Sequence, residues 1–351
     1  MSENDLISKI LNALVEPVIV VSSNRYLIAI NAAAQEIFNG GAVGADLSLT
    51  LRHPSVLRAF ADVMAGMDKV SVPLTLKMPL PTTFRMTATR LKNAKSAFGE
   101  NNDPAVVMSF NDISDGLEAE QMRSDFVTNV SHELRSPITA LSGFIETLKG
   151  AAKDDPQAQA RFLDIMEAEA ARMNRLIQDL MSLSKVETME RVRPTHKVEL
   201  EGLIQGIVNT LEPQAMANTK TIRIANQTKN PTVLGDADQL IQVFQNLIEN
   251  AIKYSRPGTE ITILIAPHSG QSGIAEIVTS VADKGEGIAA VHLPRLTERF
   301  YRVDSGRSRQ MGGTGLGLAI VKHILNRHRG RLAVTSEIGV GSNFSVFLPS
   351  A

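Results

Sequence analysis

The chain has 351 residues, of which 43% are hydrophobic and 21% are charged, with 36 basic and 37 acidic side chains. This length allows two or three domains, and the apolar content excludes a chain that is disordered throughout. The net charge of −1 and the aromatic content of 4% argue against a surface built to bind nucleic acid. Cysteine is absent, which excludes disulfides, thiolate metal sites and a cysteine nucleophile.

The first 112 residues are predicted to form a small domain of mixed α and β structure. Short apolar runs separated by turn residues predict five strands, at 18–21, 26–30, 70–78, 83–91 and 105–111. The first two form a hairpin, and a Pro-Leu-Pro turn separates the third from the fourth. Asn31 stands where it can cap a helix over 32–38. This number of short elements suits a compact domain that could hold a small ligand.

From Ser114 the apolar residues follow helical spacing instead. The first stripe consists of Phe126, Val130, Leu134, Ile138, Leu141, Ile145 and Leu148; the second of Phe162, Ile165, Met166, Met173, Leu176, Ile177, Leu180 and Leu183. A break at 150–156 separates them, so we expect a hairpin of two long amphipathic helices. One hairpin cannot cover its own apolar face, and we therefore expect a homodimer that forms a four-helix bundle.

Beyond Pro194 the pattern alternates between strands and helices, which predicts an α/β sandwich that continues to residue 351. The expected strands lie at 198–200, 221–225, 261–266, 274–282, 332–336 and 343–348, and the expected helices at 203–210, 237–254 and 316–326. The chain is thus predicted to be a multidomain α+β protein, divided into residues 1–112, 113–193 and 194–351.

His132 is the first candidate for chemistry. It lies two positions, or about 200° around a helix, from both Val130 and Leu134, and therefore points away from the packing stripe. Glu133 can hold and polarise an imidazole, and Pro137 removes a helical hydrogen bond to the Glu133 carbonyl, which predicts a kink. This combination indicates a nucleophile. The alternative is a solvent-exposed histidine without a role.

Asn246 and Asn250 lie four residues apart on one face of the strongest predicted helix, and Lys253 follows three residues later. Asparagine is a poor helix former, so its use twice in one helix is unusual. Carboxamide oxygens suit a hard cation such as Mg²⁺, and a lysine ammonium suits phosphate. The alternative is a pair of solvated polar residues.

Two glycine-containing loops follow. Asp283 ends a predicted strand ahead of Gly285 and Gly287, where its carboxylate can accept a hydrogen bond from an amine; ordinary turns share this pattern. The glycine-rich segment 312–317 opens a helix, as in a phosphate-binding loop or a flexible lid. A dinucleotide fingerprint is rejected, because the polar stretch 302–310 precedes the glycines in place of a strand.

The order and spacing of these motifs are similar to those of the sensor histidine kinases. SHELRSP resembles their phosphoacceptor box, NLIENAIKYS their asparagine box, DKGEGI their first glycine box, RFYRVD their phenylalanine box and GGTGLGLAIVKHI their second glycine box. The resemblance covers residues 113–351. The first domain resembles a PAS sensor module around EPVIVVSSNRYLIAINAAAQEIF, and the combination looks like the phosphate-regulon class of these kinases.

The resemblance implies a dimeric helical hairpin and an ATP-binding domain of the Bergerat fold. Asp283 would accept from the adenine amino group, and Asn250 would bind Mg²⁺. The other implied nucleotide-binding residues are Asn246, Lys253, Tyr254, Gly285, Gly287, Arg302, Gly313, Gly315 and Gly317. His132 would attack the γ-phosphate of ATP with Glu133 as base, and an aspartate in the receiver domain of a response regulator would then take the phosphoryl group.

Some residues depart from the family pattern. Ser136 stands where the family often has Thr or Asn, at a position associated with dephosphorylating the regulator, and a phosphatase activity is expected. His328-Arg329-Gly330 replaces the more frequent His-Gly-Gly, which we interpret as a surface change. The basic run 327–331 is predicted to be a solvated helix end rather than a nucleic-acid patch.

Two other functions remain as alternatives. The chain could be a catalytically silent dimeric scaffold that binds ATP and a regulator, or an ATPase of the gyrase or chaperone type, which the acceptor helix disfavours. No stretch approaches 18 uninterrupted apolar residues, so no membrane span is expected. We expect a cytoplasmic protein, or the cytoplasmic portion of an inner-membrane sensor whose anchor is absent from this chain.

Overall fold

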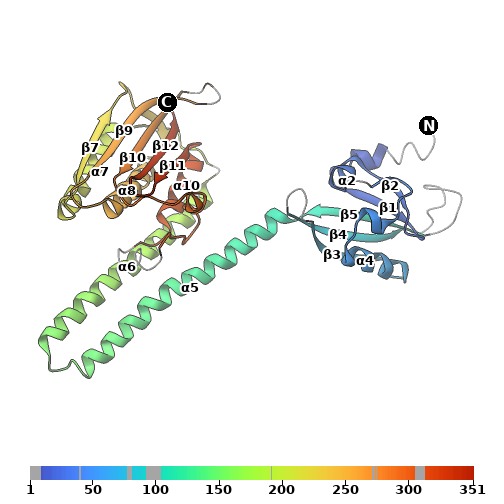
Figure 1. Ribbon diagram of the computed structural model, residues 1–351, viewed down its shortest axis with the longest axis horizontal. Helices are drawn as coiled ribbons and strands as arrows, with labels where there is room; N and C mark the ends of the chain where they lie inside the picture. Colours follow the sequence, from blue (N-terminus) through green and yellow to red (C-terminus); the bar gives the residue numbers. More distant parts are fainter. Residues whose placement is uncertain are drawn as a thin grey trace. The chain divides into compact units, whose positions relative to one another are not determined.

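The computed structural model describes residues 9–38, 41–76, 81–91, 104–190, 192–270, 273, 275–304 and 313–351. Most of the predicted Pro-Leu-Pro turn and the first glycine of the segment 312–317 lie outside this part of the chain. The protein folds into two compact units, Met1–Val127 and Thr128–Ala351, which are described separately (Figure 1).

The first unit is built on an antiparallel sheet with the strand order β2-β1-β5-β4-β3. Its strands are β1 (Val18–Ser22), β2 (Leu27–Ile30), β3 (Lys69–Leu76), β4 (Thr82–Leu91) and β5 (Ala105–Asp112). All five were predicted, with ends that differ by a residue or two. The helices are α2 (Ala32–Ile37), α3 (Leu47–Thr50) and α4 (Pro54–Met64). The amphipathic helix α4, which packs on β3 and β4, was missed by the sequence analysis.

Asn31 is fully buried and ties together three segments of this unit. Its carboxamide oxygen accepts from the backbone N–H of Ala34, as predicted for a helix cap, and also from that of Val18 on β1. Its nitrogen donates to the carbonyls of Leu11 and Glu16 at 3.1 and 2.8 Å. Since each polar atom has partners, this residue is a structural anchor.

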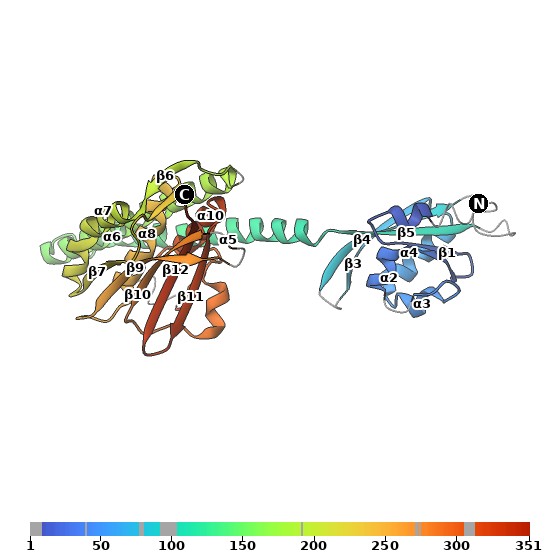
Figure 2. The ribbon, with the colours of Figure 1, turned by 90° about the horizontal axis from the view of Figure 1, so that it is seen from above.

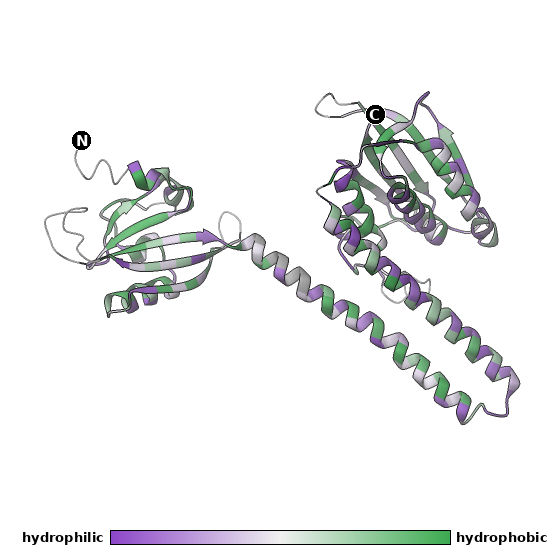
Figure 3. Ribbon diagram, turned by 180° about the vertical axis from the view of Figure 1, so that it is seen from behind, coloured by the Kyte–Doolittle hydropathy of each residue, from purple (hydrophilic) through white to green (hydrophobic). Residues whose placement is uncertain are grey.

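Two long helices follow, α5 (Ser114–Lys149) and α6 (Pro156–Met189), at the positions that the periodicity predicts. Helix α5 continues past the buried Pro137. Apolar side chains remain exposed along both helices, and Figure 3 shows hydrophobic segments at intervals along them. The exposed side chains include Ile138, Ile145, Leu163, Ile177 and Met181. An uncovered apolar face of this extent marks a protein interface.

The C-terminal part of the second unit is an α/β sandwich. Its main sheet has the order β11-β12-β10-β9-β7, in which only the β7–β9 pair is parallel. The strands are β7 (Thr221–Asn226), β9 (Glu260–Ser269), β10 (Ala275–Asp283), β11 (Arg331–Glu337) and β12 (Gly341–Pro349), with β6 (His196–Glu199) and β8 (Thr232–Gly235) paired separately. Strand β8 was not predicted.

Three helices cover one face of this sheet (Figure 2). They are α7 (Leu200–Ala217), α8 (Ala237–Tyr254) and α10 (Gly317–Arg327), and a short 3₁₀ helix, η2, spans Ala290–Arg295. Helix α7 is longer than the predicted 203–210, because it includes Pro213 and because Leu200 begins the helix instead of ending a strand. Alternate residues of β9 are fully buried beneath these helices, which gives the domain its core.

The predicted solvated helix end at 327–331 is wrong for its first two residues. Arg327 is buried, and it donates to the carbonyl of Val192 and to the carboxylate of Asp236. His328 is fully buried, with Nδ1 donating to the Ile324 carbonyl and Nε2 accepting from the N–H of Asp236. Arg329 is exposed, as a surface change requires, and its φ of +52° explains why glycine is favoured there.

Candidate functional site: an exposed histidine and an α/β nucleotide cradle

His132 lies exposed on α5, as predicted from its place opposite the packing stripe. The neighbouring Glu133 is largely buried, and its Oε2 accepts from two guanidinium groups. Arg172 of α6 donates at 2.9 Å and Arg302 of the α/β sandwich at 3.1 Å. The acceptor helix is therefore joined to the sandwich through the residue next to the candidate nucleophile.

Ser136 lies one helical turn after His132 and is also exposed. Its hydroxyl donates to the His132 carbonyl at 3.3 Å, a common local bond for serine in a helix. The hydroxyl thus lies on the side of α5 that carries the imidazole.

The two asparagines lie on α8, where it meets the start of α10. The Nδ2 of Asn246 donates to the Gln242 carbonyl at 2.9 Å. Its oxygen faces Gly317, where an added Cβ would lie 2.5 Å away, so a larger residue there would displace the Asn246 carboxamide. Asn250 follows one turn later and is half-buried. The structure thus brings together Asn246 and Gly317, two of the residues that the resemblance assigns to nucleotide binding.

Lys253 is half-buried at the end of the same helix face. Burial lowers the pKa of its ammonium group to about 8, and the positive charges of Arg302 and Arg175 add to this effect. Its neighbour Tyr254 has an exposed ring, over which the ammonium lies at 5.3 Å from the centroid. Glu249 opposes the lowering of the Lys253 pKa, and Arg302 is paired with Glu133. The positive charges of Lys253, Arg175 and Arg302 are therefore partly balanced, and the surplus of positive charge suits a site that binds phosphate.

Asp283 ends β10, and its Oδ1 accepts from the N–H of Gly285 at 2.8 Å. Burial raises the pKa of its carboxyl group, whereas the N–H groups of Gly285 and Ser342 and the charge of Lys220 oppose the rise. A Cβ on Gly285 would lie 2.5 Å from the Tyr254 carbonyl oxygen. The loop that contains Gly285 therefore packs directly against the end of α8.

The glycine-containing segment 313–317 contacts helix α6 and the loop that carries Phe300 and Arg302. Gly315 has a φ of +76°, and its carbonyl accepts from the N–H of Phe300 at 2.8 Å. The Thr314 carbonyl accepts from Arg302 at 2.8 Å, and the Thr314 hydroxyl donates to Asp179 of α6 at 2.6 Å. Gly313 is half-exposed at the start of the described segment. Arg302 thus joins the lid to Glu133.

Sequence reasoning missed Arg172 and Asp179. Each lies in the middle of α6, among other charged residues at ordinary helical spacing, and no local pattern distinguishes them. Burial raises the pKa of Asp179, which fits its place under the lid. Their role depends on contacts across the helical hairpin and with the sandwich, which a sequence alone does not specify.

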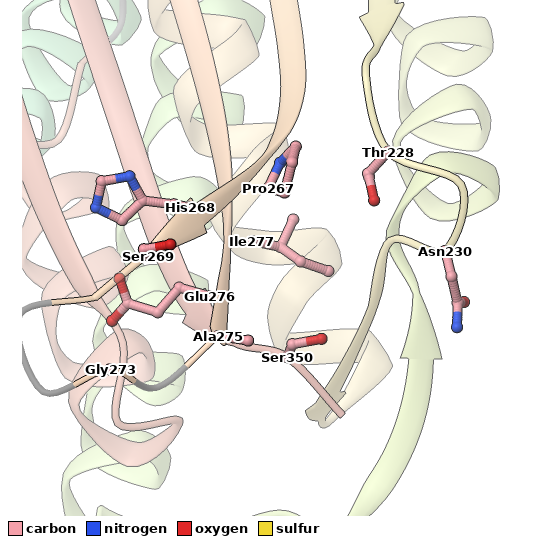
Figure 4. Close-up of a pocket in the computed structure, with 10 residues that line it drawn as sticks. All are labelled: Thr228, Asn230, Pro267, His268, Ser269, Gly273, Ala275, Glu276, Ile277 and Ser350. Atoms are coloured by element: carbon pink, nitrogen blue, oxygen red, sulfur yellow. The ribbon is translucent and has the colours of Figure 1, made fainter.

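A cavity of about 380 Å³ opens elsewhere on the sandwich (Figure 4). It is lined by Thr228, Asn230, Pro267, His268, Ser269, Gly273, Ala275, Glu276, Ile277 and Ser350. The lining residue of β10 nearest to Asp283 is Ile277, six residues away, so a strand length of about 20 Å separates this cavity from Asp283. It is therefore distinct from the candidate site.

Comparison with known proteins places this geometry in a family. Residues 122–188 match the His Kinase A (phospho-acceptor) domain, and residues 235–351 match the histidine kinase-, DNA gyrase B-, and HSP90-like ATPase. The phosphate regulon sensor protein PhoR of Pseudomonas aeruginosa is 36% identical over 346 residues, which cover 97% of this chain and 73% of PhoR. The chain therefore belongs to the sensor histidine kinases.

Other relatives match a smaller part. The sensor-like histidine kinase SenX3 of Mycolicibacterium smegmatis is 39% identical over 69% of this chain, and the match spans 62% of SenX3. The sensor protein kinase WalK of Staphylococcus saprophyticus is 37% identical over 68% of this chain and 38% of WalK. Histidine kinase ThkA, solved in complex with response regulator protein TrrA, shares the fold with a TM-score of 0.53 at 21% identity, covering 100% of this chain and 99% of ThkA.

The class defines the chemistry in general terms. The chain is a protein-histidine kinase of a two-component system, with a phosphoacceptor hairpin followed by a domain that binds ATP. The match to an acceptor domain sets it apart from ATPases of the gyrase or chaperone type. Among the helices that the structure describes, none combines the length and apolarity that a membrane crossing requires.

Proposed function

We propose that this protein phosphorylates itself on His132 with ATP and passes the phosphoryl group to an aspartate in the receiver domain of a response regulator. The observation that carries the proposal is the contact of Glu133 with Arg302, which also donates to the lid at Thr314. Through it, the residue beside the exposed imidazole is joined to the ATP-binding domain. The solved complex of ThkA with TrrA supports a response regulator as the partner.

In the proposed reaction a ring nitrogen of His132 attacks the γ-phosphorus. A nitrogen–phosphorus bond forms while the bond to the β–γ bridging oxygen breaks, and ADP leaves. Glu133 orients the imidazole and takes up the proton of the ring. The Nε of Arg302 is buried and has no hydrogen-bond partner within the described part of the chain, which leaves a donor for a phosphate oxygen.

For the nucleotide, we assign adenine recognition to Asp283 with Gly285 and Gly287, and the lid to Gly313, Gly315 and Gly317. Asn246, Lys253, Tyr254 and Arg302 would line the phosphate side, and the oxygen donor of Asn250 fits Mg²⁺. When bound, this cation would neutralise phosphate charge. The enclosed carboxyl group of Asp283 is suited to a single, oriented hydrogen bond with an amine.

The domain boundaries near residues 112 and 193 are part of the proposal. The strand order of the first unit and the extension of the PhoR match over 97% of the chain support a PAS-like sensor of the phosphate-regulon class. The exposed apolar side chains of α5 and α6 support a homodimeric four-helix bundle. The hydroxyl of Ser136, one turn from His132, supports a phosphatase activity toward the regulator.

The remaining rival is a scaffold that binds ATP without turnover. Incubation of the full chain with γ-labelled ATP and Mg²⁺ decides between them. We expect acid-labile, base-stable label that disappears in His132→Gln and in Asn250→Ala. His196→Gln, at an exposed histidine of β6, is the matched control and should retain the label. Label that persists in the His132 variant would overturn the assignment.

A further inference from the structure

Lys220 is a buried lysine for which the proposed reaction has no use. It lies between α7 and β7, and only 5% of it is exposed. Lysine is rarely buried to this extent unless its ammonium group is paired. Its Nζ donates to the carbonyl of Ile252, in the last turn of α8. Carbonyls of a last helical turn have no partner within the helix, and a cation there is favourable.

The backbone fixes where Lys220 points. The backbone N–H of Lys220 donates to the carbonyl of Ala215, in the last turn of α7, at 2.9 Å. The preceding Thr219 has a φ of +56°, a left-handed conformation that is unfavourable for threonine, and its carbonyl accepts from Gly258 at 2.7 Å. These bonds hold the strained turn that directs the side chain under α8.

The end of α8 in turn holds the loop that carries the adenine-recognition residue. Ser255 and Gly285 form a β-bridge, and the N–H of Arg256 donates to the Lys284 carbonyl at 3.3 Å. Gly285 supplies the N–H that Asp283 accepts. A shift of the last turn of α8 would therefore move a hydrogen-bond donor of Asp283.

The charge of Lys220 also acts on Asp283 directly. Burial of the carboxyl group raises the pKa of Asp283, and the ammonium group of Lys220 is the positive charge that opposes this rise. Burial lowers the pKa of Lys220, and the Asp283 carboxylate opposes that change in return. The two groups favour each other's ionised state. An ionised carboxylate only accepts hydrogen bonds, whereas a protonated one can also donate.

We propose that Lys220 is a positioning residue for purine specificity, which holds the end of α8 and keeps Asp283 an acceptor for the amino group of adenine. This inference rests on the proposed role of Asp283. With the lysine removed, the end of α8 and the Gly285 N–H that orients Asp283 lose their support. The carboxylate is then a poorer acceptor for the amino group, and the site loses part of its preference for the 6-amino purine.

The test measures binding of ADP and of IDP to the full chain by titration calorimetry. In the native protein ADP should bind at least about 30-fold more tightly than IDP, because a 6-oxo group faces an acceptor. Lys220→Met removes the charge and keeps the apolar stem. We expect this variant to bind ADP about tenfold more weakly and to change the affinity for IDP less than threefold, so that the preference for ADP over IDP becomes smaller. Lys229→Met, at an exposed lysine beyond β7, should change neither.

Each outcome has a defined meaning. Equal weakening of both nucleotides in Lys220→Met would show a purely structural role and overturn the inference, as would an unchanged preference. A native protein without preference would overturn the adenine role of Asp283, and this inference with it. If the Met variant does not fold, Lys220→Gln, which retains a donor for the Ile252 carbonyl, is measured by the same criteria.

Discussion

The acceptor helices and the ATP-binding domain fix their functional groups in different ways. His132 is exposed on α5, and the adjacent Glu133 is paired with two arginines, whose side chains are long and flexible. Asp283 ends strand β10, next to a loop whose glycines meet backbone atoms of other elements. The loop after Asp283 is thus held by backbone packing, and the residue next to the candidate nucleophile by side-chain ion pairs.

This difference suits the two tasks. A site that recognises one nucleotide gains affinity when it is preformed. A histidine that must meet first a γ-phosphate and then a receiver domain has to be accessible to both. Substitutions that disturb backbone packing should therefore be far more damaging in the ATP-binding domain than changes of similar size on the helices.

The largest effect is expected at Gly287. Its φ is +74°, and a Cβ would collide with the backbone of Glu337. We expect Gly287→Ala to lower the free energy of unfolding of the ATP-binding domain by roughly 3 kcal/mol or more and to abolish ADP binding. Gly258→Ala is the matched control, with the same φ of +74° and no atom within 4 Å. The free energy of unfolding of this variant should fall by about 1–2 kcal/mol, measured by chemical denaturation. Equal losses would contradict the packing argument.

A smaller effect is expected on the helices. Ile177 of α6 is 44% exposed within one chain, although its place in the apolar stripe suggests that a second copy covers it. Ile177→Glu should raise the dimer dissociation constant about 30- to 100-fold, equivalent to about 2–3 kcal/mol, because a carboxylate would enter the bundle. Light scattering across a dilution series measures this.

Met216→Glu provides the control for the dimer, because Met216 is 64% exposed on α7, away from the helical hairpin. It should leave the oligomeric state unchanged. A native chain that is monomeric at micromolar concentration would contradict the predicted bundle.

The smallest effect concerns the charge of Lys253. Its pKa is lowered to about 8, so the ammonium group is charged below this pH and loses its proton above it. A bound phosphate favours the charged form, and ADP affinity should therefore fall as the pH rises, about threefold or more between pH 7.5 and 9. Calorimetry at several pH values measures the slope. Lys253→Arg, which stays charged, should remove most of it; an identical slope in both proteins would assign the titration to another group.

The sequence was sufficient where a function depends on local pattern. The exposed side of α5 followed from helical spacing, the cap at Asn31 from a polar residue before an apolar run, and the start of α10 from glycines ahead of an apolar run. These features need only neighbouring residues. Helix α4 was missed, although its apolar residues are regularly spaced, because short helices carry little periodic signal.

The residues that the sequence did not reveal act over long separations. Arg172 meets Glu133 across 39 positions, and Arg327 meets Asp236 across 91. Both belong to ordinary charged stretches whose partners become known only once the helices are packed. Lys220 is similar, because nothing in the sequence distinguishes a buried lysine from an exposed one.

The bonds of Arg327 and His328 bear on how kinases of this kind can be recombined. Arg327 holds the carbonyl of Val192, in the segment after α6, and both residues hold Asp236, the cap of the helix that carries Asn246 and Asn250. A hybrid joined within α6 would keep this attachment from the parent that supplies the ATP-binding domain. A hybrid joined between Val192 and β6 would take Val192 from one parent and Arg327 from the other. The contact between these two residues would then join different parents, and the same Arg327 side chain also binds Asp236, the cap of the asparagine helix.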